Sequence, residues 1–355
     1  MKTVAVTGAA GGLGRRVLPL VLADPTVGRV VAIDRSPVTT NGDRVEAHRL
    51  DLARSDLAPL LEGVDEIVHL AFVLGEGRRA DAAARVNLEG TRRLLAAASA
   101  AGVHHVVALS SATVYGAWPN NPIPLTEDAP LRPNPDVAYA VQKSYVEHLV
   151  ADWADADVAR TAAVLRPVTA LAADGDTWVA SALAEAASIR AGEDDPPAQF
   201  VHLDDLATAV DLARRGHLDG PYNVAPDGWI AGATVRALHG GGPRLRLPDR
   251  LAARLEHIRW RLRRGRASLG LLSFATHPCV VANGRLRSAG WVPVRTNEQA
   301  YVAGTEAKWW TTLSPKRRQE LALGASAVVL AAIAALAGFG IRRAVRRARA
   351  RRIGS

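Results

Sequence analysis

The sequence is poor in cysteine and in aromatic side chains. Among its 355 residues there is one cysteine, Cys279, and aromatic residues make up 5%. A single cysteine cannot close a disulfide within the chain or build a cysteine-rich metal site, and the pair His104-His105 lacks metal-ligand spacing. The first residues, from Met1 to Gly8, lack the charged, long apolar and cleavage regions of a signal peptide. We therefore expect no metal centre, a reducing compartment and a fold that begins at once.

Acidic residues are absent from residues 321–355, which hold seven arginines. Residues 321–341 carry no charge at all, and as a helix they would extend about 31 Å, close to the ~30 Å hydrocarbon thickness of a bilayer. We predict a transmembrane or membrane-embedded helix over 321–341, preceded by a linker over 306–320 and followed by an arginine-rich tail over 342–355. A buried helix of the soluble fold is the alternative. Because the basic excess lies beside an apolar run, we expect membrane lipid and not nucleic acid as the partner of this tail.

The first half of the chain alternates short apolar runs with helical stretches. The runs typical of strands cover residues 4–7, 30–33, 66–70 and 106–109, with later strands at 164–166 and 200–202, and the helical segments cover 13–23, 57–61 and 87–101. Such alternation predicts right-handed βαβ units and a parallel sheet that is covered on both faces. We predict an α/β fold with a doubly wound core over residues 1–170. A smaller substrate-binding region over 171–305 is interleaved with the last core strands.

A glycine-rich loop joins the first predicted strand to the first predicted helix. It reads Thr7-Gly8-Ala9-Ala10-Gly11-Gly12-Leu13-Gly14. The first glycine permits a tight turn, the second lets the backbone approach a pyrophosphate, and the last lets the helix pack closely on the strand. This context predicts a Rossmann-type dinucleotide site. Its cofactor-binding residues in the loop are Gly8, Gly11, Gly12, Leu13 and Gly14.

The choice between NAD and NADP depends on Asp34, which ends the second predicted strand. A carboxylate at this position accepts hydrogen bonds from both ribose hydroxyls and repels a 2′-phosphate. NAD is therefore the predicted cofactor. Arg35 follows directly and is a further cofactor-side residue, which keeps NADP open as the less favoured alternative.

Three residues with acid/base chemistry follow in the next part of the chain. Ser111 stands where the strand over 106–109 runs into hydroxyl residues, and Tyr139 and Lys143 are four residues apart, on one face of a helix. A lysine ammonium, together with the positive charge of a nicotinamide, lowers the pKa of a phenol from about 10 towards neutrality. The tyrosine then exchanges a proton with a substrate hydroxyl or carbonyl. We predict Ser111, Tyr139 and Lys143 as the catalytic residues.

With these motifs the sequence resembles the extended short-chain dehydrogenase/reductase family, of the NAD-dependent epimerase/dehydratase type. The resemblance covers about residues 1–305 and also includes the stretches at residues 51–52, 69–71, 87–91, 110–116, 165–167 and 200–207. It implies a Rossmann fold, and it implies that Lys143 also holds the nicotinamide ribose. Asp51 and Leu52 would flank the adenine, Ala71 would line the dinucleotide groove, and Asn87 would serve as the structural or cofactor-side asparagine. Thr113 would be a second hydroxyl near the substrate.

Two departures from the family pattern concern the substrate. Sugar-nucleotide epimerases often carry an asparagine that meets the diphosphate where this chain has Thr169, and often an arginine where it has Ala198. Two diphosphate contacts are therefore missing, although Thr169 stays a candidate substrate residue. The substrate is then either a sugar derivative or a lipophilic alcohol or ketone. In the second case the chain would be similar to membrane-attached 3-beta-hydroxysteroid dehydrogenases.

The leading functional hypothesis is an oxidoreductase or epimerase that transfers hydride at a secondary alcohol or ketone. The alternative from another class is a dinucleotide-binding sensor or scaffold without turnover, and the retained acid/base residues argue against it. We expect a cytoplasmic body that is attached to the membrane through the C-terminal segment. The arginine tail leaves the topology of that segment open, since the positive-inside rule opposes its export. The family resemblance also implies a homodimer.

Overall fold

A computed structural model describes residues 1–40, 42–73, 80–174, 196–238, 271–305 and 317 of the chain. The chain divides into two compact units, Met1–Glu306 and Ala307–Ser355, and the predicted boundary near residue 170 lies inside the first. In the part of the chain that the structure describes, no helix is long and apolar enough to cross a membrane. The predicted helix over 321–341 and the tail over 342–355 lie outside the described residues.

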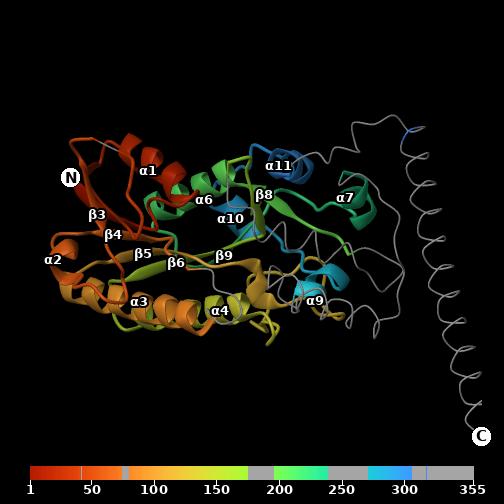
Figure 1. The fold of residues 1–355 in the computed structure, drawn as a ribbon, viewed down its shortest axis with the longest axis horizontal. Helices are drawn as coiled ribbons and strands as arrows, with labels where there is room; N and C mark the ends of the chain where they lie inside the picture. The colour runs from red at the N-terminus through yellow and green to blue at the C-terminus, as the bar shows by residue number, and fades with distance from the viewer. Residues whose placement is uncertain (41, 74–79, 175–195, 239–270, 306–316, 318–355) are drawn as a thin grey trace, which may run out of the picture. The chain divides into compact units, whose positions relative to one another are not determined.

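A parallel sheet of seven strands forms the centre of the first unit (Figure 1). Its strand order is β3-β2-β1-β4-β5-β6-β9, and each neighbouring pair is parallel. The order reverses between β1 and β4, which makes their carboxyl ends the switch point where such sheets bind ligands. This confirms the predicted Rossmann-like α/β core. The strand bounds are β1 Lys2–Thr7, β2 Val27–Asp34, β3 Val45–Arg49, β4 Glu66–His69, β5 His105–Leu109, β6 Thr161–Pro167 and β9 Gly220–Val224.

Helices cover both faces of this sheet, as its continuously apolar strands require (Figure 1). Alternate residues of β1 point to opposite faces, so that Val4 packs in one core cluster and Ala5 in the other. The first cluster contains residues of α1 and α6, and the second contains residues of α2, α3 and α4. These helices are α1 Gly14–Ala23, α2 Ala58–Leu61, α3 Ala80–Ala101, α4 Ala138–Asp155 and α6 Leu203–Arg215.

The region after β6 adds a second, two-stranded sheet and short helices. Residues 200–202 form the predicted strand, β8 Phe200–His202, but it pairs in parallel with β7 Thr169–Leu171 and not with the core sheet. The last strand of the core sheet is instead β9, which the apolar pattern does not show. The described helices of this region are α7 Gly232–Leu238, α9 Leu271–Thr276, α10 Gly284–Ser288 and α11 Asn297–Gly304.

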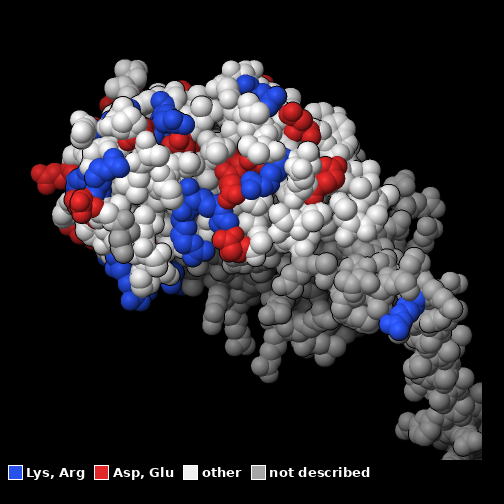
Figure 2. Space-filling model, turned by 90° about the horizontal axis from the view of Figure 1, so that it is seen from above, with Lys and Arg blue, Asp and Glu red and all other residues white. Residues whose placement is uncertain are grey.

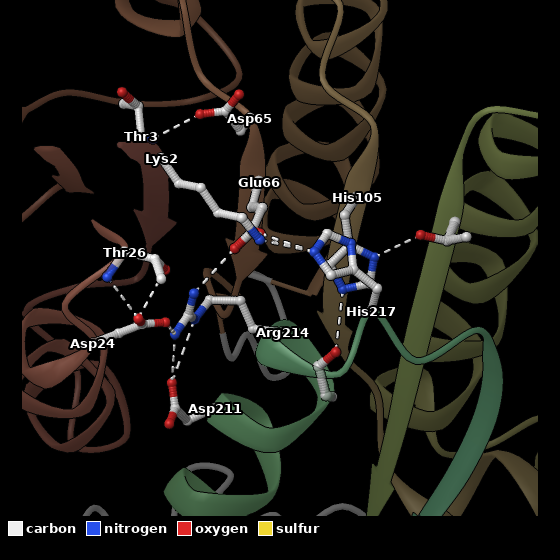
Figure 3. A network of polar contacts seen from close by, with 12 residues as sticks. Lys2, Thr3, Asp24, Thr26, Asp65, Glu66, His105, Asp211, Arg214 and His217 are labelled. Atoms are coloured by element: carbon white, nitrogen blue, oxygen red, sulfur yellow. Dashed lines mark hydrogen bonds and ion pairs between the residues drawn. The ribbon is translucent and has the colours of Figure 1, made fainter. Parts of the chain in front are cut away.

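A buried polar network ties the amino ends of the strands together (Figure 3). Arg214 at the end of α6 is 1% exposed, and its guanidinium contacts Glu66 at 3.1 Å and Asp24 at 2.7 Å. It also reaches Asp211 at 3.0 Å. Burial acts to raise the pKa of the Glu66 carboxyl, but Lys2 and Arg214 outweigh burial and hold that pKa below its usual value. The network therefore joins β1, β4 and α6 at the end of the sheet that lies opposite the switch point.

The same network brings together groups that can bind a metal ion. The ligand atoms of Glu66, His104 and His217 lie within 4.8 Å of one another, a grouping that the sequence spacing did not suggest. The Lys2 ammonium already lies 2.6 Å from Glu66 and 2.9 Å from the His217 ring. A lysine thus supplies the positive charge that the buried carboxylate requires.

Acidic and basic side chains lie among one another on the face of the described residues that Figure 2 shows. Ion pairs between partly exposed side chains of the described residues include Arg29 with Glu46 at 2.7 Å and Arg295 with Asp204 at 3.1 Å. This mixture agrees with a body whose charge is nearly balanced, apart from the arginine-rich C-terminal residues.

Candidate active site

The glycine-rich loop leads from β1 into α1 in a conformation that only small residues allow. Gly8 has φ +72°, and a Cβ there would lie 2.7 Å from the backbone nitrogen of Ala71. A Cβ on Gly14 would lie 2.2 Å from the carbonyl oxygen of Gly8. The two contacts show why strand, loop and helix can approach so closely, and why the backbone at the start of α1 is open to a phosphate.

A cavity of about 300 Å³ lies at the carboxyl ends of β1, β2 and β4. Most of the predicted cofactor residues line it: Gly8, Gly11, Asp34, Arg35, Asp51, Leu52, Ala71 and Asn87. Gly12, Leu13 and Gly14 are not part of its lining, and Leu13 is instead buried in the core beside α1. The cavity is therefore where the sequence predicts the adenosine half of a dinucleotide.

Asp34 connects the end of β2 with the glycine-rich loop. One of its carboxylate oxygens accepts a hydrogen bond from the Ala10 backbone at 3.0 Å, and the other accepts one from the Ser36 backbone at 2.8 Å. A carboxylate has about four lone-pair positions, so both oxygens keep capacity for ribose hydroxyls. The carboxylate faces the cavity, and the residues present fit the predicted dinucleotide.

Hydrogen bonds between uncharged groups hold the lining of the cavity in place. The His69 ring bridges Thr7 at 2.7 Å and Thr91 at 2.9 Å, and burial lowers the pKa of His69 to about 3. Asn87 on α3 holds the backbone of Val73 through two hydrogen bonds, of 2.7 and 2.9 Å. It also donates to Gln142 of α4 at 2.8 Å. Asn87 therefore acts as a clamp between the cavity wall and the helix that carries Tyr139 and Lys143.

The structure brings Ser111, Tyr139 and Lys143 together. Ser111 caps the short 3₁₀ helix η2 Ala112–Tyr115, and its hydroxyl accepts a hydrogen bond from the Thr113 hydroxyl at 2.9 Å. Burial raises the pKa of Tyr139 to about 12, while a hydrogen bond with Ser111 opposes this rise. Thr113, a candidate substrate residue, thus lies next to Ser111. The other candidate substrate residue, Thr169, is half-buried at the start of β7.

Lys143 is 3% exposed, and its ammonium donates to the Leu109 carbonyl at 2.6 Å. Burial lowers the pKa of Lys143 to about 7, although the Glu147 carboxylate acts to raise it. The expected lowering of the tyrosine pKa is therefore not seen in this state. The ammonium is turned towards Leu109, and it lies 5.9 Å from the centre of the Tyr139 ring.

Comparisons with known proteins agree with this arrangement. Residues 4–225 match the sequence profile of the NAD dependent epimerase/dehydratase family. The chain belongs to the NAD-dependent epimerase/dehydratase family. Its glycine-rich loop, Asp34 and the three predicted catalytic residues all fall inside the matched residues.

Individual relatives cover different shares of the chain. The chain is 28% identical to an uncharacterized protein of Mycobacterium tuberculosis over 238 residues, which are 64% of this chain and 63% of that protein. It is 38% identical to UDP-glucose 4-epimerase of Mycolicibacterium smegmatis over 157 residues, 40% of this chain and 48% of the epimerase. The match thus spans less than two thirds of either relative.

A solved structure extends the likeness to the C-terminal region of the fold. It is a short-chain dehydrogenase/reductase superfamily protein from Agrobacterium tumefaciens with bound NAD, with a TM-score of 0.62 and 25% identity. The superposition covers 91% of this chain and 99% of that one. The likeness supports the extended short-chain dehydrogenase/reductase type that the motifs indicate.

A second buried ion pair lies next to the predicted catalytic residues of this epimerase/dehydratase family member. Arg166 on β6 binds Glu147 of α4 at 2.7 Å, one helical turn after Lys143. Glu147 also accepts a hydrogen bond from Ser110, the neighbour of Ser111. Arg166 is within the Leu165-Arg166-Pro167 motif, but its partner lies 19 residues away in the sequence. The pair fixes α4 against the strand ends that carry Ser110 and Ser111.

Phe72 lies at the site but belongs to none of the sequence motifs. Phe72 follows directly after the His69-Leu70-Ala71 stretch and lines the cavity, and its ring meets Tyr139 edge to face with 5.3 Å between ring centroids. The Lys143 ammonium lies 4.0 Å from the centre of the same ring. No spacing rule reveals this contact, because it depends on how β4 and α4 pack.

Proposed function

We propose that the protein is an NAD-dependent oxidoreductase or epimerase that transfers hydride at a secondary alcohol or ketone. The observation that carries this proposal is the convergence of Ser111, Tyr139 and Lys143 beside a cavity at the switch point of the sheet. Bound NAD would accept hydride from the substrate carbon or return it. Glycines whose Cβ atoms would block the loop, together with the Asp34 carboxylate, would hold this cofactor.

Tyr139 is the proposed acid/base residue. In alcohol oxidation its oxygen takes the hydroxyl proton as the substrate carbon loses hydride, and in ketone reduction it returns the proton. Ser111, already linked to Tyr139, would donate to the same substrate oxygen. Lys143 would turn from Leu109 towards Tyr139 and the ribose, and its positive charge would then lower the pKa of the phenol.

Two substrate classes remain candidates, and a separate observation favours each. UDP-glucose 4-epimerase is among the relatives, which supports a sugar derivative. The surroundings of Tyr139 are apolar, because its ring packs in a cluster with Val137, Ala140 and Phe274. Sugar-nucleotide enzymes often bind the diphosphate at the two positions that Thr169 and Ala198 occupy here. These two residues and the apolar surroundings of Tyr139 favour a lipophilic alcohol or ketone as the substrate.

The experiment that tests the activity uses the purified full-length chain. Mass spectrometry of the denatured protein identifies any copurifying dinucleotide. NADH absorbance follows the oxidation of a panel of cyclic secondary alcohols, and chromatography follows the interconversion of UDP-glucose and UDP-galactose, which forms no net NADH. A retained, non-exchanging NAD supports an epimerase or dehydratase, and a freely exchanging NAD supports a dehydrogenase. Tight NAD binding with no turnover of any panel member would favour the sensor or scaffold.

The selectivity for NAD over NADP is proposed to depend on Asp34. Replacing Asp34 with alanine should weaken NAD binding roughly tenfold or more, because hydrogen bonds to a charged group contribute about 1.5–3 kcal/mol. Asp34→Asn is the matched control, since it keeps an acceptor for the Ala10 backbone but removes the charge. We expect NADP to gain on NAD in both variants, as measured by calorimetric titration. An unchanged ratio of the two affinities would show that Asp34 does not distinguish the ribose hydroxyls of NAD from the 2′-phosphate of NADP.

A further part of the proposal concerns membrane attachment through the C-terminal segment. We propose that the body is cytoplasmic and attached to the membrane through residues 321–341, because this uncharged run leads directly into seven arginines. The test is sedimentation with vesicles that contain anionic lipid, for the full chain and for a chain that ends at residue 320. Size-exclusion chromatography with light scattering on the same samples tests the proposed homodimer.

A further inference from the structure

The cavity ends at Phe72 and does not reach the catalytic pair. Phe72 and Val73 belong to its lining, whereas Tyr139 and Lys143 do not. Lys143 is 3% exposed, so its ammonium has no open path to the dinucleotide space. The Phe72 ring therefore separates the proposed cofactor cavity from Tyr139 and Lys143, which are proposed to contact the nicotinamide end of the cofactor.

Two neighbours cover the Lys143 ammonium. The Leu109 carbonyl accepts one of its N–H groups at 2.6 Å, and the face of the Phe72 ring lies 4.0 Å away. An ammonium has three donors and no acceptor, and the face of an aromatic ring attracts it electrostatically. The Phe72 ring both borders the cavity and faces the ammonium, so a ribose hydroxyl that approaches Lys143 from the cavity meets the ring. The ring and the ribose compete for the same cation.

The backbone beneath Phe72 is held firmly, which makes the side chain the part that can change. Asn87 fixes the next residue, Val73, through hydrogen bonds to both its N–H and its carbonyl. The Phe72 ring itself is only partly buried and borders open cavity. A rotation of the side chain can thus uncover Lys143 without moving β4.

We propose that Phe72 is a gating residue for the nicotinamide half of the cofactor: its ring covers Lys143 and has to move aside for the dinucleotide to reach this lysine. This inference rests on the proposed function in one respect, because it takes the cavity to bind NAD. The adenosine half reaches its part of the cavity without passing the ring. Phe72 should therefore affect NAD binding and leave AMP binding nearly unchanged.

The charged and titratable groups around Lys143 are few. Glu147 acts to raise the pKa of Lys143, and His69 is kept neutral by burial, which lowers its own pKa to about 3. Tyr139 is neutral as well, because burial raises its pKa to about 12. Burial is thus the main influence that holds the pKa of Lys143 at about 7, and the Phe72 ring is one of the groups that cover the ammonium. Removing the ring should admit water, favour the ammonium and raise this pKa towards its usual value.

The experiment measures the reactivity of Lys143 with acetic anhydride across a pH series, followed by peptide mass spectrometry. In Phe72→Ala we expect the pKa of Lys143 to rise, because water that enters the space of the ring stabilises the ammonium more than the ring did. Labelling above that pKa should become about tenfold faster, because the amine is then open to the reagent. Phe72→Leu fills much of the same volume but has no π face. The pKa and the labelling rate of Lys143 in this variant should lie between those of Phe72→Ala and those of the unmodified protein. Phe200→Ala is the matched control, since Phe200 packs against Tyr301 in another core cluster, and Lys143 should react as in the unmodified protein. Circular dichroism verifies that each variant is folded.

The second part of the experiment compares the binding of NAD with that of AMP. Phe72→Ala should raise the ratio of NAD affinity to AMP affinity about tenfold, because NAD no longer displaces the ring, while AMP affinity changes less than twofold. Unchanged Lys143 labelling or an unchanged affinity ratio in a folded variant would overturn the gate. If the unmodified protein binds neither nucleotide, the proposed function fails, and the labelling result still decides whether Phe72 covers Lys143.

Discussion

Replacing Tyr139 with phenylalanine should lower the turnover number by about 10²–10⁴-fold, the usual contribution of a positioned acid/base group. The ring remains, so its edge-to-face contact with Phe72 and its packing against α9 should persist. Only the oxygen that we propose to exchange the substrate proton is lost. The measurement compares turnover of the most active alcohol or ketone of the substrate panel by NADH absorbance, with NAD affinity measured in parallel.

The control for this prediction is Tyr145→Phe on the same helix. Tyr145 is 58% exposed, so the loss of its hydroxyl should leave both turnover and NAD binding unchanged. A Tyr139→Phe variant that binds NAD and turns over like the unmodified protein would assign the proton transfer to another group. An equal loss in both variants would indicate a general effect on folding.

Replacing Arg214 with methionine should reduce the free energy of unfolding by about 3–5 kcal/mol, because the buried carboxylates of Asp24, Glu66 and Asp211 lose a shared charged partner. Glu66 is fully buried and Asp24 nearly so, and Arg214 contacts both (Figure 3). The pKa of Asp24 is lowered chiefly by its hydrogen bond with Arg214, so ionised Asp24 stabilises the folded state, and this contribution is lost as pH falls towards that pKa. The measurement is urea unfolding, monitored by circular dichroism at neutral and acidic pH.

The neighbouring arginine provides a matched control for this prediction. Arg215 lies 2.9 Å from Asp211, but its side chain is 58% exposed. Exposed ion pairs contribute about 0–1 kcal/mol, so Arg215→Met should change stability by no more than that. If Arg214→Met were as mild as Arg215→Met, the network would not hold the amino ends of the strands together.

The apolar pattern predicted the interior strands of the sheet and missed both of its edges. β1, β2, β4, β5 and β6 were found because strands covered on both faces are continuously apolar. β3 was missed because its five residues are only half-buried or exposed, so no apolar run marks it. β9 begins with Gly220-Pro221, residues that disfavour a central strand but are tolerated at an edge.

The sequence predicts those site residues that are paired by local spacing and misses those that only the tertiary fold brings together. Tyr139 and Lys143 share a helix face, so spacing alone pairs them, and the motif order adds Ser111. The contact of Phe72 with Lys143 and the ion pair between Glu147 and Arg166 join elements that are distant in sequence. The direction of the tyrosine pKa shift was also not predictable, because it depends on where the ammonium of Lys143 points and on how deeply the phenol is buried.

We propose that NAD binds in the cavity between Asp34 and Phe72. Calorimetric titration of the full-length protein, freed of any bound nucleotide, with NAD and separately with NADP tests this most directly. One NAD should bind per chain, and the affinity for NADP should be at least ~10-fold weaker, because the Asp34 carboxylate repels a 2′-phosphate. Failure of the folded protein to bind either dinucleotide, or tighter binding of NADP than of NAD, would contradict it.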